Sequence, residues 1–133
     1  MSFFSSPEEV DKYIGEMFRA AANHPEVGPK MKAAKLHMQV FYSDPDCELN
    51  VRFDEPMEVQ LGPSTHKPDI TLRMKADTAD KFWRGNYNFA VGMAKGEVKS
   101  KGPVSKLLKM VPLTKPLFPV YRDLIAQKDT GQA

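Results

Sequence analysis

Apolar and polar residues alternate with two different periods along this chain, and the changes of period mark the elements that it predicts. Ser6-Pro7-Glu8-Glu9 is a helix-opening pattern, because Ser6 can cap, Pro7 suits the first helical position and Glu9 can complete a capping box. Apolar residues then recur at three- and four-residue steps until Asn23-His24-Pro25, which predicts an amphipathic helix of about four turns. They are Val10, Tyr13, Ile14, Met17, Phe18 and Ala21.

From Lys35 the period becomes two, which is typical of strands with one dry and one wet face. Four strands are predicted, and the turn residues Ser43-Asp44-Pro45-Asp46 should join the first two as a hairpin. Their inward positions are Leu36, Met38, Val40 and Tyr42, then Cys47, Leu49, Val51 and Phe53, then Met57, Val59 and Leu61, and finally Ile70, Leu72 and Met74.

The second half returns to helical spacing. Asp77 or Thr78 can cap a short helix that carries Ala79, Phe82 and Trp83 and stops at Gly85, and Asn88 can cap another that ends at Gly96. Residues 97–101 alternate as a fifth strand, and apolar stripes over 104–111 and 117–125 predict one or two final helices, with a frayed tail after Lys128. The fold class is therefore α+β in a single domain, residues 1–133, with a five-stranded, mostly antiparallel sheet and helices covering one face.

Composition excludes several classes of protein. Hydrophobic residues make up 41% of the 133, enough for one core, and no apolar run reaches the eighteen residues needed to cross a bilayer. The first residues lack the pattern of a secretory signal, and the lone Cys47 fits a reducing compartment, so a cytoplasmic location is expected. A net charge of +2 is too small to indicate nucleic acid.

Charge is nevertheless uneven. Between Lys95 and Lys115 there are six lysines and one acid, Glu97. Such a face can simply protect an edge strand from pairing, or it can attract anionic lipid headgroups or an acyl-CoA phosphate. The candidate contacts for a headgroup or a membrane are Lys99, Lys101, Lys106 and Lys109.

Reactive side chains form no catalytic pattern. His24, His37 and His66 have no zinc spacing and are expected to be exposed, while Cys47 is expected to be a buried small hydrophobe. No serine lies in a nucleophile elbow, and no metal or cofactor site is indicated. Arg52 and Arg73, on the polar sheet face, should pair with acids or meet a headgroup.

Methionines are frequent on the predicted inward positions. There are eight in the chain, and their flexible side chains suit a wall that reshapes around an apolar ligand. Apolar stripes with these spacings are, however, also typical of plain core. Periodicity alone leaves both interpretations open.

The run from Asp69 to Gly102 adds information. It contains Asp69-Ile70-Thr71-Leu72, Ala79-Asp80-Lys81-Phe82, Gly85, Asn88-Phe89-Ala90, Met93, Gly96-Glu97-Val98-Lys99 and Gly102. This run resembles the sterol carrier protein two family, in which a strand starting at an aspartate leads through a helix, a glycine and a short helix to a Gly-x-hydrophobic-Lys-x-x-Gly strand. The spacings match over about a quarter of the chain, and the order of elements is similar throughout.

The resemblance implies a five-stranded sheet covered by helices on one side and enclosing a tunnel for fatty acyl chains, acyl-CoA, phospholipid or sterol. The C-terminal helix often lies over that tunnel. Two features depart from the family: the chain ends Thr130-Gly131-Gln132-Ala133 rather than in a peroxisomal address, and Pro112, Pro116 and Pro119 interrupt the C-terminal cover.

The main hypothesis is a non-catalytic intracellular carrier of an apolar, lipid-like ligand. An accessory module that docks to a partner enzyme and presents a hydrophobic substrate is the alternative, and an enzyme in its own right is a third. Inward strand positions and covering stripes give the expected cavity lining: Met38, Val40, Leu49, Val51, Leu72, Met74, Phe82, Trp83, Phe89, Met93, Leu107, Leu108, Met110, Phe118 and Tyr121.

Overall fold

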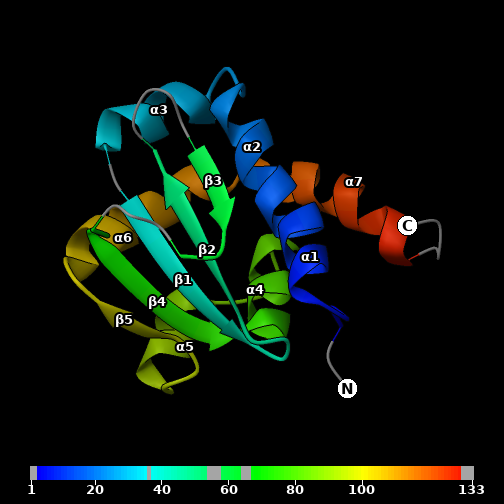
Figure 1. The fold of residues 1–133 in the computed structure, drawn as a ribbon. Helices are drawn as coiled ribbons and strands as arrows, with labels where there is room; N and C mark the ends of the chain where they lie inside the picture. Colours follow the sequence, from blue (N-terminus) through cyan, green and yellow to red (C-terminus); the bar gives the residue numbers. More distant parts are fainter. Residues whose placement is uncertain (1–2, 36, 54–57, 64–66, 130–133) are drawn as a thin grey trace.

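A five-stranded mixed sheet forms one layer of the fold (Figure 1). The computed structural model describes residues 3–35, 37–53, 58–63 and 67–129. The strands are β1 (His37–Ser43), β2 (Cys47–Arg52), β3 (Glu58–Leu61), β4 (Ile70–Lys75) and β5 (Lys99–Lys101), in the spatial order β3-β2-β1-β4-β5. Only the β1–β4 pairing is parallel among these strands; the other three are antiparallel, so the predicted α+β class is confirmed.

The N-terminal helix begins where the sequence predicts. It consists of α1 (Pro7–Val10), a π-helical stretch η1 (Asp11–Gly15) and α2 (Glu16–Ala22) in direct succession. The Ser6 hydroxyl accepts a hydrogen bond from the Glu9 amide at 3.3 Å, while the Glu9 carboxylate accepts from the Ser5 amide at 3.0 Å. Both halves of a capping box are present, with Ser5 as the second donor in place of Ser6.

A short helix, α3 (Val27–Ala34), was not predicted from the periodicity. Gly28 and Pro29 lie in its first turn, where a missing amide donor is tolerated, and only Val27, Gly28 and Met31 are buried. A Cβ on Gly28 would lie 2.8 Å from the Ala22 carbonyl oxygen, so glycine allows α3 to pack directly against the end of α2. With so few apolar positions, the helix has no readable stripe.

Two helices follow the fourth strand. In α4 (Ala76–Trp83) neither Asp77 nor Thr78 is the N-cap, because the helix begins directly after Lys75, and the Asp77 carboxylate instead accepts from the Phe3 amide at 2.9 Å. In α5 (Phe89–Ala94) the Asn88 side chain accepts from the Val91 amide at 3.1 Å, as predicted.

Glycines end both of these helices. Gly85 follows α4 with φ +87° and Gly96 follows α5 with φ +78°, in the left-handed region that favours glycine. The next strand is shorter than predicted, because β5 comprises only three residues and Glu97 and Val98 precede it, with Val98 buried.

The C-terminal segment forms α6 (Val104–Met110), a 3₁₀ turn η2 (Val111–Thr114) and α7 (Leu117–Asp129). The interruption predicted from the prolines is present between α6 and α7, but not within α7. Pro112 lies in the 3₁₀ turn, Pro116 precedes α7, and Pro119 occupies the first turn of α7, where no intrahelical donor is required. The cover therefore includes an uninterrupted helix of 13 residues.

All helices that contribute to the core pack on the face to which Met38, Val40 and Tyr42 of β1 point. Figure 1 shows α4 behind the strands, with α1, α2 and α7 on one side and α5 and α6 on the other. The predicted dry and wet faces are confirmed. Leu36, Met57 and His66 lie outside the described residues.

One prediction on the wet face was wrong. His37 is only 7% exposed, and its Nε2 lies 3.1 Å from Oδ1 of Asn50, which is also buried. The Asn50 amide donates to the Glu48 carboxylate and to the Gly62 carbonyl, and Glu48 also accepts from Gln39. Polar residues that bond to one another across strands bury each other, which alternation alone does not reveal.

A buried carboxylate ties the C-terminal helix to the rest of the fold. Asp80 of α4 accepts from the Tyr121 hydroxyl of α7 at 2.7 Å and from Nε of Arg84 at 3.0 and 2.9 Å. Burial and the neighbouring Asp80 charge raise the pKa of Tyr121, so it remains a donor at all ordinary pH values. This contact holds α7 and α4 in fixed register.

We expect Tyr121→Phe to lower the free energy of unfolding by about 1.5–3 kcal/mol, because a buried hydrogen bond to a charged acceptor is lost. Tyr87→Phe is the matched control: the Tyr87 hydroxyl donates to Glu97 at 2.6 Å, but that pair is exposed. Urea unfolding of both variants checks this. Equal losses would contradict the structural role given to the buried pair.

Candidate functional site

An apolar cavity lies between the dry face of the sheet and the helices. Its volume is about 60 Å³, and it is lined by side chains from both layers. β1 and β4 supply the floor, α4, α5 and α6 supply most of the cover, and α2, α3, the end of β2 and η2 close the remaining sides. The lining residues are Phe18, Met31, Met38, Val40, Tyr42, Phe53, Leu72, Met74, Ala79, Phe82, Trp83, Phe89, Leu107, Met110, Val111 and Thr114.

Nine of the residues expected from the sequence come together around this cavity. They are Met38, Val40, Leu72, Met74, Phe82, Trp83, Phe89, Leu107 and Met110. Because β1 and β4 are adjacent and parallel, Val40 lies directly beside Leu72, and Tyr42 beside Met74. Seven further lining residues were not among those expected, including Phe18 of α2, which had been placed on the apolar stripe of the N-terminal helix, and Met31 of α3, the helix that was not predicted.

The structure places the other six expected residues elsewhere. Leu49 and Val51 are fully buried on β2, which β1 separates from β4. Tyr121 donates a hydrogen bond to Asp80. Met93 and Phe118 are partly buried against the core without lining the cavity. Leu108 is 42% exposed: it is one residue from the inward Leu107, a rotation of about 100° on a helix of 3.6 residues per turn.

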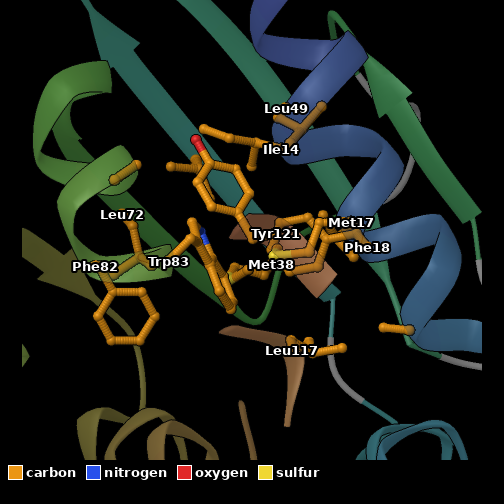
Figure 2. Packing of buried hydrophobic residues seen from close by; sticks show 14 of the residues in the cluster. Ile14, Met17, Phe18, Met38, Leu49, Leu72, Phe82, Trp83, Leu117 and Tyr121 are labelled. Carbon is orange, nitrogen blue, oxygen red and sulfur yellow. The ribbon is translucent and has the colours of Figure 1, made fainter. Parts of the chain in front are cut away.

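Trp83 lies at the centre of an aromatic cluster at one wall of the cavity (Figure 2). Its ring contacts Phe18 and Phe82 edge-to-face, with centroid distances of 5.3 and 4.8 Å. Phe82 in turn contacts Phe89 at 5.5 Å and Phe118 at 5.6 Å. Edge-to-face contact is an arrangement that aromatic pairs prefer, so these rings form a fixed wall beside the empty space.

Size determines what the cavity accepts without rearrangement. A dry cavity of about 150 Å³ admits benzene, so 60 Å³ is too small for a long acyl chain as it stands. Four of the lining residues are methionines: Met31, Met38, Met74 and Met110. Their three rotatable bonds permit a change of cavity shape at low cost, so expansion would begin with them.

Among the residues that the structure describes, no charged side chain lines the cavity. The Thr114 hydroxyl donates to the Val111 carbonyl at 2.6 Å, so its donor is satisfied within η2. Burial raises the pKa of the Tyr42 hydroxyl, which therefore stays neutral. The lining offers no acid, base or activated nucleophile, and its chemistry suits the binding of hydrocarbon.

Cys47 is half-buried beside Tyr42 at the end of the β1–β2 hairpin, rather than fully buried as predicted. Burial, together with the nearby carboxylates of Asp46 and Glu8, raises the pKa of its thiol to about 11. A thiol of this kind is a poor nucleophile at neutral pH.

The predicted headgroup contacts lie at the opposite edge of the sheet from β3. Lys99 and Lys101 project from β5, and Lys106 and Lys109 are exposed on α6. Of the two arginines predicted on the polar sheet face, Arg52 pairs with Glu58 at 3.5 Å, as expected. Arg73 instead stacks over the Phe41 ring at 4.3 Å and forms no ion pair with any described residue.

The described residues contain neither a cluster of metal ligands nor a helix that could span a membrane. No group of three or more His, Cys, Asp or Glu side chains there could hold a metal ion. No helix in that part of the chain has both the length and the apolar character needed to cross a bilayer.

Solved structures show what this fold is similar to. Sterol carrier protein 2 from Yarrowia lipolytica superposes with a TM-score of 0.64 at 19% identity, covering 80% of this chain and 93% of that one. Sterol carrier protein domain 2 of Helicoverpa armigera gives 0.66 at 17% identity, covering 83% and 88%. Palmitated SCP2L2 from Aedes aegypti gives 0.55 at 14% identity, covering 80% and 94%. The chain thus has the fold of sterol carrier protein 2 domains over most of its length.

Part of a larger enzyme is also similar. The sec-alkylsulfatase Pisa1 from Pseudomonas superposes with a TM-score of 0.57 at 17% identity over 64% of this chain, which spans only 14% of that enzyme. No protein-family model and no curated protein matches the sequence.

We expect Cys47 to react slowly with iodoacetamide at pH 8, because a thiol of pKa about 11 is ionised in roughly one molecule in a thousand. The rate should rise with pH toward 11 and should increase sharply at pH 8 after unfolding in urea. Mass spectrometry of quenched time points measures it. A native rate equal to that of the unfolded chain would contradict the raised pKa.

Proposed function

We propose that the protein binds and carries an apolar, lipid-like ligand in the cavity between the sheet and its helices, without catalysing a reaction. The observation that carries this proposal is an uncharged cavity with four methionines in its wall, in a fold shared with sterol carrier protein 2 domains. Fatty acids, fatty acyl-CoA, phospholipids and sterols are the ligand classes considered. A reducing, cytoplasmic location belongs to the same proposal.

Hydrocarbon burial supplies the affinity. Each methylene transferred from water contributes about 0.8 kcal/mol, so ten buried methylenes contribute about 8 kcal/mol. This corresponds to micromolar dissociation before the cost of enlarging the cavity is subtracted. A ligand with a long chain or a fused ring system can offset that cost, whereas a short one cannot.

Expansion should take place on the side formed by α5 and α6. The opposite side is held by the Tyr121–Asp80 bond and by fully buried residues such as Ile14 and Leu117. Next to α5 and α6, the lining residues Met74 of β4 and Val111 of η2 are only partly buried, and Ser105, Lys106, Leu108 and Lys109 of α6 are exposed. Fewer buried contacts make a local opening less costly.

Titration of the protein with a fatty acid should change the fluorescence of Trp83 in a saturable way, because Trp83 is the chain's only tryptophan and lines the cavity. Ala79→Leu should weaken binding at least about tenfold, since its larger side chain projects into a space that is already small. Ala90→Leu, the same change at an exposed site on α5, should leave the affinity unaltered. Absence of saturable binding by the unmodified protein, or equal affinities for both variants, would refute the proposal.

A second candidate function is an accessory module that presents a hydrophobic substrate to a partner enzyme. The observation that favours it is the similarity to a part of Pisa1, in which this fold occurs within a longer chain. Both functions use the cavity, but only the second requires the protein to bind a partner enzyme. Salt-dependent capture of one dominant partner enzyme, lost on charge reversal at Lys99, Lys101 and Lys106, would favour the module.

A further inference from the structure

We infer that the edge formed by α5, β5 and α6 is a docking surface for an anionic lipid bilayer. This edge is defined by residues 89–110, and it closes the sheet on the side opposite β3. In Figure 1 the three elements lie on the other side of the strands from α1, α2 and α7. The inference goes beyond the proposed function and is tested separately from it.

The α5–β5–α6 edge is rich in lysine. Lys99, Lys101, Lys106 and Lys109 form no ion pair with any described residue, and the only acid between Lys95 and Lys115, Glu97, accepts a hydrogen bond from Tyr87 at 2.6 Å. The N-terminal helix on the far side has four acids and two bases over residues 7–22. A charge difference between opposite edges turns the α5–β5–α6 edge toward an anionic surface.

The sheet extends this basic surface at a cost in stability. Arg73 of β4 lies directly opposite Lys99 of β5, and both are exposed on the same face. Like charges facing each other across neighbouring strands are unfavourable. Protection of an edge strand explains lysines on β5. Arg73 lies on the inner strand β4, where it stacks over the Phe41 ring at 4.3 Å and adds a further cation to the same face.

Two exposed aliphatic side chains lie on the same helices that border the lysine-rich edge. In the described part of the chain, the exposed large hydrophobic side chains are Val91 and Leu108, at 44% and 42%. They project from α5 and α6, and Leu108 lies between Lys106 and Lys109 in sequence. Single aliphatic side chains between lysines are suited to the headgroup region, where the chain enters the bilayer and the ammonium groups stay among phosphates.

Composition favours a bilayer over an acidic protein as the partner. Protein interfaces are enriched in aromatic residues and arginine and depleted in lysine. Residues 90–110 contain five lysines, no arginine and no aromatic residue, and Arg73 of β4 is the arginine paired with this edge. The same helices, α5 and α6, supply Phe89, Leu107 and Met110 to the cavity, so docking would bring the less tightly held side of the cavity to the membrane.

The test is flotation with phosphatidylcholine vesicles, with and without phosphatidylserine. The unmodified protein should bind only the anionic vesicles, and less at high salt. Lys106→Gln with Lys109→Gln should weaken binding by about 30-fold, at roughly fivefold per cation, and Lys99→Gln with Lys101→Gln should do the same. Leu108→Gln should weaken binding by about tenfold through loss of an inserted side chain.

Lys12→Gln with Lys30→Gln is the control, because it removes the same charge from η1 and α3. It should change vesicle binding by less than about threefold. Equal loss in the control pair, equal binding to neutral vesicles or no vesicle binding at all would overturn the inference. Fatty acid binding in solution, read from Trp83, should be unchanged in every lysine variant, so failure of docking and failure of carriage are distinguishable.

Discussion

The helices do not fill the dry face of the sheet completely, and the cavity that remains is the central feature of this structure. Met38, Val40 and Leu72 present an aliphatic floor, while Phe82 and Trp83 approach it as rigid rings that meet each other edge-to-face. A cavity of about 60 Å³ is left between this floor and the rings. The remaining space is apolar and bordered by methionines, and the proposed carriage of an apolar ligand rests on it.

The two sides of the molecule differ in how firmly they are held. The N-terminal helix and α7 are joined through fully buried side chains and through the Glu9–Lys128 pair at 2.7 Å, and α7 is tied to α4 through Tyr121 and Asp80. Short helices, a three-residue strand and a 3₁₀ turn make up the other side. A rigid frame with one looser wall is the arrangement that the proposed ligand entry requires, and the same wall carries the exposed lysines and Leu108.

Local signals in the sequence predicted the elements well. Ser6 and Asn88 cap helices, Gly85 and Gly96 end them, and alternation located the strands, because each of these depends on neighbours in sequence. Long-range features were not accessible in the same way. The parallel pairing of β1 with β4 decides which inward residues meet, and it placed Val40 beside Leu72 while it left Leu49 and Val51 outside the cavity. His37 was misassigned for a related reason, since its burial depends on Asn50 across the strand pair.

The central claim is that the cavity holds an apolar molecule, and native mass spectrometry of gently purified protein tests it most directly. We predict a population heavier than the bare chain by the mass of one small apolar molecule, which organic extraction removes and releases for identification. A spectrum containing only the bare chain, unchanged after incubation with fatty acids, phospholipids and sterols, would contradict the account.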